Sequence, residues 1–382
     1  MTRKSHKNSK TGCMQCKRRH VKCDENHPRC LNCRAIGLKC AYKNGARLSV
    51  GEEQQISQKY ELCLAIENGY LRSSDFPMQP LKDINVLHLK LFHHFFAKIA
   101  FFFWSAPGDE SIYQDIIVDT ALKHPHLMEG LLGFSALHMS EHTPELQDYY
   151  RGIATSYYNS ALSSLKERLG YIDESSSIAV LLLSNLIGAH SFREVFASIS
   201  NTTYSDFLKN MIQLINLQHG IRAIIVPWWQ WFWSSELGPI IRNSHEFRMR
   251  STRLNGSDTE MLKQFILSRE MQERPRQIYL KEIQNLQIDY NQLRLNADGT
   301  SGSVHGLFTW LITVSNEFIL LLQADQPDAL LIFSFYGVIL HHYRNFWLVQ
   351  DAGRILVNFV IDRLGLDYSP CLRWVDQQTR VG

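Results

Sequence analysis

The sequence of 382 residues has no apolar run that reaches the roughly 18–20 residues of a membrane-spanning helix. The apolar stretch at 101–104 follows Lys98, and the one at 320–322 follows Asn316 and Glu317. The N-terminus is basic and polar and lacks the apolar segment of a secretory signal. We therefore expect no membrane span and a reducing compartment, where cysteines are thiols or metal ligands.

Strand patterns and catalytic motifs are scarce as well. Alternating β-branched runs bounded by hairpin turns are nearly missing, which favours an all-α architecture. The motifs G-x-S-x-G, H-E-x-x-H, G-x-x-x-x-G-K-[ST] and G-x-G-x-x-G do not occur, so we predict that the protein is not an enzyme. Histidine pairs occur at 93–94 and 341–342. Because adjacent residues on a helix point about 100° apart, each pair is expected to be structural rather than metal-binding.

Acidic residues are rare in the first fifty positions, which hold thirteen Lys+Arg but only Asp24 and Glu25, a net charge of +11. The remaining residues hold 27 Lys+Arg against 35 Asp+Glu, a net charge of −8. The total of +3 therefore hides two oppositely charged parts. The basic part is also poor in large apolar residues, so hydrophobic burial alone cannot fold it.

Six of the eight cysteines lie in this basic part, while Cys63 and Cys371 stand alone and are expected to be ordinary thiols. The six form two C-x2-C-x6-C halves separated by six residues, which indicates an internal duplication. Two zinc ions need eight Zn–S bonds, and six thiolates supply eight only when two of them bridge. We predict a binuclear cluster with two Zn²⁺; the alternatives are disulfides or a single-zinc finger with two spare cysteines. The ligands are Cys13, Cys16, Cys23, Cys30, Cys33 and Cys40.

This segment, with the run CKRRHVKCDE at 16–25 and Pro28 shortly before the fourth cysteine, resembles the fungal binuclear zinc-cluster (six-cysteine) transcription factors. The resemblance implies that the first cysteine of each half, Cys13 or Cys30, bridges both metals. The other cysteines complete one zinc each: Cys16 and Cys23 the first, Cys33 and Cys40 the second. Because zinc binding contributes roughly 10–16 kcal/mol in such modules, we expect this one to unfold without metal.

Basic side chains fill the interval between the second and third cysteines: Lys17, Arg18, Arg19, His20 and Lys22. The equivalent interval of the second half has only two basic residues and is padded by apolar ones. A short helix starting near Cys16 is expected to point its end into a DNA major groove, where Arg or Lys contacts guanine. By resemblance, Arg19 and His20 fall at base-contacting positions and a CGG-like triplet is the half-site. The alternatives are a solvated face or a nuclear-import signal.

The chain divides by composition into four parts: a basic tail at 1–12, the zinc-cluster domain at 13–42, a linker at 43–80 and a large all-α regulatory domain at 81–382. The linker is polar, but residues 56–67 follow a helical spacing for about two turns. In the resembled family a dimerising helix often lies here, whereas a short helix docked on the next domain is the alternative. In the large domain, apolar residues recur every three or four positions at 81–95, 127–135 and 307–318, as in amphipathic helices.

Residues 121–138 and 91–95 resemble the regulatory domain of the sterol-uptake-control-like branch of the same family. This resemblance implies an apolar cavity for a sterol or another lipid-like effector. An aromatic cluster would line the cavity, or would instead form an aromatic core or interface. The cluster consists of Trp228, Trp229, Trp231, Phe232 and Trp233.

The sequence thus predicts a nuclear, zinc-dependent, sequence-specific regulator of fungal RNA polymerase II transcription that binds double-stranded DNA. A homodimer and a small apolar effector are the further partners that the resemblance suggests. The alternative function is a protein-interaction or RNA-binding scaffold, which would show no sequence preference on duplex DNA.

Overall fold

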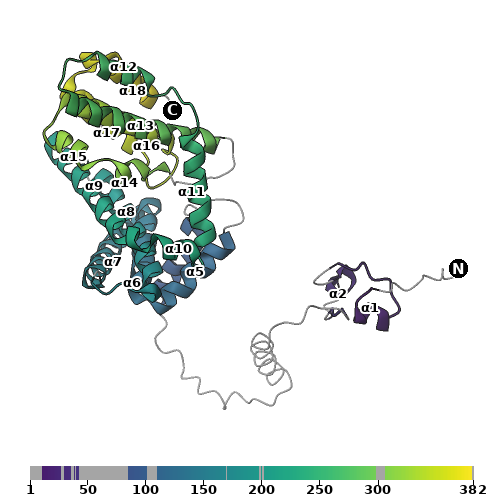
Figure 1. Ribbon diagram of the computed structural model, residues 1–382. Coiled ribbons are helices and arrows are strands. Elements are labelled where there is room, and N and C mark those ends of the chain that lie inside the picture. The colour runs from purple at the N-terminus through teal and green to yellow at the C-terminus, as the bar shows by residue number, and fades with distance from the viewer. Residues whose placement is uncertain are drawn as a thin grey trace. The chain divides into compact units, whose positions relative to one another are not determined.

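The computed structural model describes residues 11–26, 30–35, 38, 40–42, 85–100, 110–168, 170–197, 199, 202–297 and 306–380. The chain forms two compact units, Met1–Ile84 and Asn85–Gly382. Over the described residues the regular elements are all helices, with no strand (Figure 1). The predicted fold class, a small six-cysteine module followed by a large all-α domain, is confirmed. The expected linker at 43–80 and its helix lie outside the described residues.

The first unit contains one short helix in each half of the cysteine repeat, α1 (Met14–Arg18) and α2 (Leu31–Ala35). Each helix follows directly on the first cysteine of its half, Cys13 or Cys30. A five-residue helix is too short to be stable by itself. Its geometry must therefore be imposed by the cysteines at its start and in its first turn.

The second unit is built of packed helices. Helix starts are set locally, because Asn85, Thr203 and Ser315 each accept a bond from the backbone N–H three residues on. The helices are α4 (Val86–His94), α5 (Glu110–Lys123), α6 (Pro125–His142), α7 (Gln147–Arg168), α8 (Glu174–Ala197), α9 (Tyr204–Ile225), α10 (Trp229–Ser234), α11 (Gly238–Thr252), α12 (Glu260–Ser268), α13 (Glu273–Ala297), α14 (Thr309–Thr313), α15 (Asn316–Gln323), α16 (Pro327–His342), α17 (Ala352–Leu364) and α18 (Pro370–Arg380). A π-helical turn, Phe95–Ile99, extends α4.

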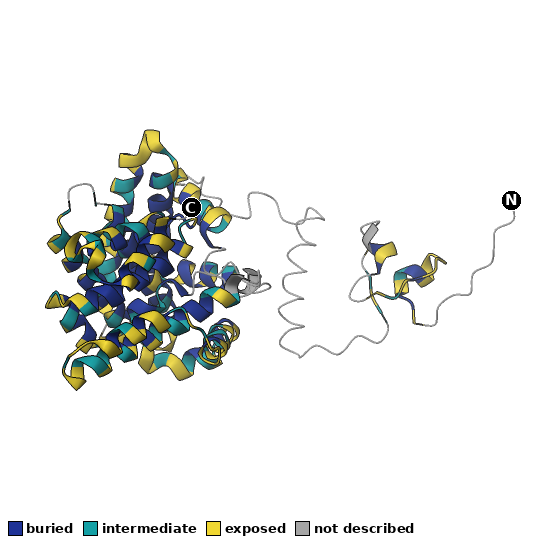
Figure 2. Cartoon of the chain, turned by 90° about the horizontal axis from the view of Figure 1, so that it is seen from above, coloured by how far each residue is buried: buried dark blue, intermediate teal, exposed yellow. Residues whose placement is uncertain are grey.

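Two nearly fully buried helices organise the core, which Figure 2 shows as a dark blue interior. Helix α6 packs against α4, α7 and α8, and α16 packs against α13, α17 and α18. Gly337 on α16 and Gly353 on α17 allow a close crossing, because a Cβ at Gly353 would collide with the Gly337 carbonyl. The expected helix at 307–318 is two helices, α14 and α15, since the backbone leaves the helical conformation at Val314 and Ser315 caps the second helix.

The expectation that no apolar run is long enough to span a membrane does not hold for α8. By length and composition, this helix could cross a membrane, and the bent pair α15 and α16 passes the same test when taken as one span. However, 72% of the apolar stretch of α8 is buried inside the domain, as in an ordinary core helix. Burial among other helices, which the sequence cannot display, explains its apolar composition.

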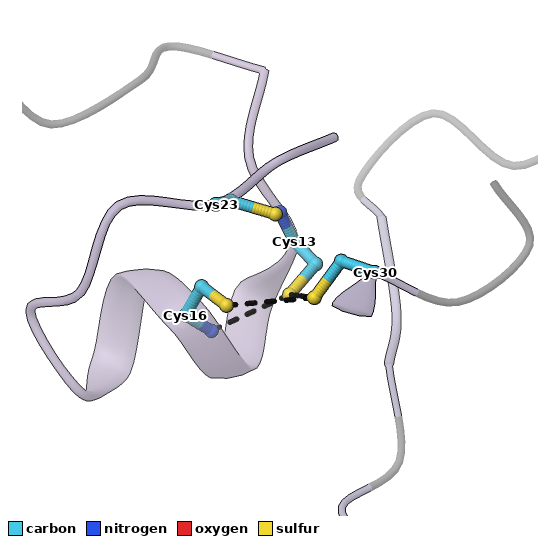
Figure 3. A group of neighbouring side chains, drawn as sticks. All are labelled: Cys13, Cys16, Cys23 and Cys30. Atoms are coloured by element: carbon cyan, nitrogen blue, oxygen red, sulfur yellow. Dashed lines mark hydrogen bonds between the residues drawn. The ribbon is translucent and has the colours of Figure 1, made fainter. Parts of the chain in front are cut away.

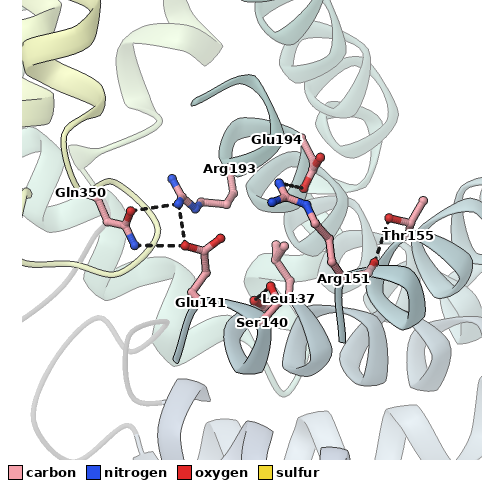
Figure 4. A network of polar contacts seen from close by, with 8 residues as sticks. All are labelled: Leu137, Ser140, Glu141, Arg151, Thr155, Arg193, Glu194 and Gln350. Carbon is pink, nitrogen blue, oxygen red and sulfur yellow. Dashed lines mark hydrogen bonds and ion pairs between the residues drawn. The ribbon is translucent and has the colours of Figure 1, made fainter. Parts of the chain in front are cut away.

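A buried polar network joins α6, α8 and the turn before α17 (Figure 4). The Arg193 Nη2 atom lies 2.6 Å from Glu141 Oε2 and donates to Gln350 Oε1 at 2.9 Å. The Arg193 and Glu141 side chains are only 9% and 8% exposed. Gln350 has a φ of 45°, the left-handed conformation that non-glycine residues seldom adopt. The network therefore fixes a strained turn against two core helices.

Candidate metal centre and nucleic-acid interface

The six predicted cysteines come together at one place. Their sulfur atoms form two groups of four, with all atoms in a group within 4.8 Å of one another. One group is Cys13, Cys16, Cys23 and Cys30, drawn in Figure 3, and the other is Cys13, Cys30, Cys33 and Cys40.

The spacing of the sulfur atoms fits tetrahedral metal coordination. The Cys13 sulfur lies 3.7 Å from that of Cys30 and 3.6 Å from that of Cys33. With Zn–S bonds of about 2.3 Å, the edge of a tetrahedron is about 3.8 Å. These contacts are therefore better understood as edges of two tetrahedra than as thiol hydrogen bonds. The two groups share Cys13 and Cys30, so their eight ligand positions are filled by six sulfurs.

Backbone N–H groups point at the sulfurs in a pattern that repeats with the sequence. The amide of Cys16 donates to Cys13 Sγ at 3.4 Å, and that of Cys33 donates to Cys30 Sγ at 3.4 Å. Likewise the Cys13 amide donates to Cys23 Sγ, and the Cys30 amide donates to Cys40 Sγ. Such bonds orient the ligands and stabilise negative charge on sulfur. The sequence duplication is thus also a structural duplication.

Burial and hydrogen bonds act in opposite directions on these thiols, and backbone N–H donors lower the pKa of Cys13 to about 6 and also lower that of Cys23. Burial raises the pKa of Cys16 to about 12, and it raises the pKa of Cys30 as well. Zinc ligation requires the deprotonated thiolate, and the metal supplies the compensating charge. Among the described residues, these two cysteine groups are the only sets of three or more His, Cys, Asp or Glu ligand atoms close enough to share an ion.

Three side chains that support the cluster were missed from the sequence. The Asp24 carboxylate accepts the Leu31 N–H at 3.1 Å, at the start of α2. Asn32 Nδ2 donates to the Lys22 carbonyl at 2.8 Å, and the Tyr42 hydroxyl donates to the Asn26 carbonyl at 3.0 Å. These bonds join the two halves. They link residues 7 to 16 positions apart, a separation that leaves no periodic signal.

The five basic residues lie at the C-terminal end of α1 and just beyond it, all exposed. The helix starts at Met14, two residues before the expected position near Cys16, because Cys13 caps it. Lys17 and Arg18 form its last turn, and Arg19 is its C-cap. The remaining two, His20 and Lys22, follow the helix. The exposed basic residues thus lie at one end of a helix whose start is fixed by the cysteine ligands.

The turn after α1 is a Schellman motif. The Val21 N–H donates to the Cys16 carbonyl at 3.1 Å, and the His20 N–H donates to the Lys17 carbonyl at 3.2 Å. His20 has a φ of 53° and occupies the position at which glycine is usual. The second half contains the equivalent outer bond, from the Leu38 N–H to the Cys33 carbonyl at 3.0 Å.

The other candidate residues are dispersed in the helical domain. His93 is exposed, while its neighbour His94 hydrogen-bonds to His138 at 3.0 Å, so the pair does not share a ligand. His341 is buried and His342 is exposed.

The aromatic cluster is also divided. Phe232 is fully buried, and Trp228 and Trp231 pack against the core at partial exposure. Trp233 contacts His245, and Trp229 is 42% exposed. Of the five aromatic side chains, Trp229 borders an apolar cavity between α5, α8, α9 and α11.

Comparisons with known proteins match both parts of the chain. Residues 11–49 match the family described as "Fungal Zn(2)-Cys(6) binuclear cluster domain". Residues 90–271 match the family described as "Fungal specific transcription factor domain". The first match covers all six cysteines and the five basic residues, and the second covers α5 to α12.

Individual relatives are similar to different extents. A Zn(2)-C6 fungal-type transcription factor of Gibberella zeae is 23% identical over 92% of this chain and 81% of its own length. A second such factor, from Aspergillus fumigatus, is 28% identical over 52% of this chain, which spans about half of that relative. Sterol uptake control protein 2 of Saccharomyces cerevisiae is 55% identical over 26% of this chain and 10% of its own length.

Proposed function

Because the chain belongs to the fungal Zn(2)-Cys(6) transcription factors, which are DNA-binding proteins and not enzymes, we propose that it reads CGG-like triplets of double-stranded DNA in the major groove. Its six cysteines hold two zinc ions. The observation that supports the proposal best is the exposed basic end of α1, fixed by a cysteine at each side. We also propose that the protein acts in the nucleus.

In the zinc centre, Cys13 and Cys30 are the bridging ligands. Support comes from the two groups of four sulfurs, which have only these two residues in common. Cys16 and Cys23 then complete one site, and Cys33 and Cys40 the other. Native mass spectrometry of the full chain is expected to show two zinc ions at saturation. A single bound zinc would contradict the bridged arrangement.

On DNA, Arg19 reads a base and Lys17 binds the backbone, with Arg18, His20 and Lys22 completing the surface. Arg19→Ala is expected to cost about 1–3 kcal/mol and to relax specificity at one position. Lys17→Ala is expected to weaken all sequences alike and to reduce the salt slope by about one. Binding titrations at several salt concentrations, on matched and mismatched duplexes, separate the two roles. A uniform loss in both variants would refute this division.

Selection from a randomised duplex library by the zinc-loaded full chain tests the whole proposal. Enrichment of two CGG-like triplets at a fixed separation would support a homodimer, held by residues of the 43–80 linker, whereas one triplet indicates a monomer. Failure to enrich any sequence, with and without chelator alike, would favour an interaction scaffold instead.

The helical domain is proposed to control this activity in response to a lipid-like effector. The support is an apolar cavity in that domain, bordered by Trp229. Substitutions on α5 to α11 that fill the cavity would test this control function. They are expected to change reporter transcription while the affinity for duplex DNA, measured separately, stays unchanged.

A further inference from the structure

The cavity lies within the second unit, is bordered by α5, α8, α9, α10, α11 and α14, and opens to the surface beside the exposed residues Asn185 and Trp229. Its volume is about 290 Å³. Most of its wall is apolar, and none of its lining residues is charged. The apolar lining includes Leu181, Leu182, Ala189, Leu237, Ile240 and Phe308. Such a lining excludes an ionised ligand, because its charge would be desolvated without a partner.

Four polar side chains interrupt this apolar wall: Tyr113, Asn185, Gln218 and Ser244. Asn185 is exposed, and the Ser244 hydroxyl donates to the Ile240 carbonyl. Gln218 on α9 is 5% exposed, and Tyr113 on α5 is 8% exposed. Over the described residues neither side chain has a hydrogen-bond partner. The carboxamide of Gln218 and the hydroxyl of Tyr113 are nevertheless not completely covered by protein atoms. Buried polar groups are normally bonded, and an exception in a cavity wall calls for a partner from within the cavity.

The position of Gln218 is built into the packing of α8 against α9. Gly188 lies on α8 where a Cβ would come within 2.7 Å of Gln218 Nε2. A glycine there makes room for the carboxamide beside the helix backbone. Any larger residue at 188 would displace the amide from its place in the cavity wall.

We propose that this cavity binds a small neutral molecule, apolar over most of its surface and bearing a hydroxyl or carbonyl group that bonds Gln218 and Tyr113. The volume stands near the lower end of the roughly 300–1,000 Å³ of ligand pockets. A medium-chain alcohol or a one- or two-ring compound fits, whereas a four-ring sterol is too large. This inference rests on the proposed effector function and specifies its ligand class.

The test uses the zinc-loaded full chain and 1-octanol as the probe, measured by calorimetric titration at pH 7. We expect saturable binding at one site, and at least tenfold weaker binding of octanoate, whose carboxylate is charged at that pH. Ergosterol is expected not to displace octanol. Lack of saturable octanol binding, equal binding of octanoate, or displacement by ergosterol would overturn the proposal.

Matched variants locate the site. Gln218→Leu is expected to weaken octanol binding about tenfold, while Gln213→Leu, the same change on the same helix but outside this cavity, leaves it unchanged. Tyr113→Phe, which removes one oxygen atom, serves as the second variant should Gln218→Leu unfold. Wild-type affinity in both variants would contradict the anchoring roles. Because DNA selection needs no octanol, loss of DNA enrichment with octanol binding retained would reject the proposed function and leave the cavity inference standing.

Discussion

At the scale of single residues, His20 is the most informative position of the zinc module. It is a non-glycine residue in the left-handed conformation, which costs about 1–2 kcal/mol relative to a right-handed one. Seventeen positions later, the sequence duplication has Gly37 at the equivalent place. The half with the basic surface therefore has a strained histidine where the sequence of the other half has glycine. The strain is consistent with a role for the imidazole outside folding.

His20→Gly separates that role from stability. We expect zinc retention against a chelator to stay within about 1 kcal/mol of wild type, because relief of strain is offset by the greater chain entropy of glycine. Affinity for the selected duplex is expected to fall, since the side chain is lost from the basic surface. Fluorescence anisotropy with labelled duplex measures the affinity. Unchanged DNA affinity would show that His20 is only a helix-capping residue.

Residue spacing was enough to predict a zinc centre, but it did not predict the side chains that hold the two halves of the centre together. The cysteine repeat and the run of basic residues are local patterns, and both lie together in the structure. By contrast, Asp24 caps α2 across seven residues, and Tyr42 closes the loop at Asn26 across sixteen. These hydrogen-bond partners are brought together by the metal centre, so no local sequence pattern predicts them. The strained backbone of His20 could not be predicted from the sequence either.

At the scale of elements, the contact of α4 with α6 depends on neutral histidines. Burial, together with the nearby charges of His142 and Lys98, lowers the pKa of His94 to about 4 and that of His138 to about 3. The ordinary value is 6.5, so both rings are neutral in the folded domain at pH 7. In the unfolded chain they take up protons from about pH 6.5 downward.

Stability of the helical domain is therefore expected to be complete above pH 6.5 and to fall as the pH drops from 6.5 towards 4, where the folded state begins to bind the same protons. Urea unfolding at a series of pH values measures this loss. His94→Gln should flatten the dependence, whereas His93→Gln, the same change at the adjacent exposed position, should not. An equal effect of both variants would contradict the assignment to the α4–α6 contact.

Two ion pairs on α8 allow a matched test of burial. Arg193 and Glu141 form a buried pair that also holds Gln350, whereas Arg151 and Glu194 are 30% and 38% exposed. Glu141→Ala is expected to lower the free energy of unfolding by about 3–5 kcal/mol, because it leaves a buried guanidinium uncompensated. Glu194→Ala should cost less than about 1 kcal/mol. Chemical denaturation measures both, and similar losses would contradict the role of burial.

Helix boundaries show which element-level features the sequence can predict. The apolar recurrence at 127–135 falls within α6, but the similar recurrence at 307–318 is divided between α14 and α15. Periodicity records which faces are buried and does not record a break before a capping serine. The apolar content of α8 likewise reflects enclosure by neighbouring helices.

At the scale of the whole molecule, the opposite charges of the two parts correspond to two compact units with different sources of stability. The first unit has a core of cysteines, and the second has a large apolar core. A strong zinc chelator is therefore expected to abolish DNA binding and the structure of the first unit, since zinc supplies roughly 10–16 kcal/mol there. The thermal transition of the helical domain should remain, because its core contains no metal ligand set among the described residues.

Differential scanning calorimetry with and without chelator measures both transitions, and one cysteine substitution in each unit serves as the matched pair. Cys16→Ser is expected to reduce zinc content and DNA affinity while leaving the helical transition in place. Cys371→Ser, at a buried thiol of the second unit, should retain two zinc ions and full DNA affinity while lowering the helical transition by a few degrees. A helical transition that disappears with the zinc would show that the two units fold as one, against their separate cores.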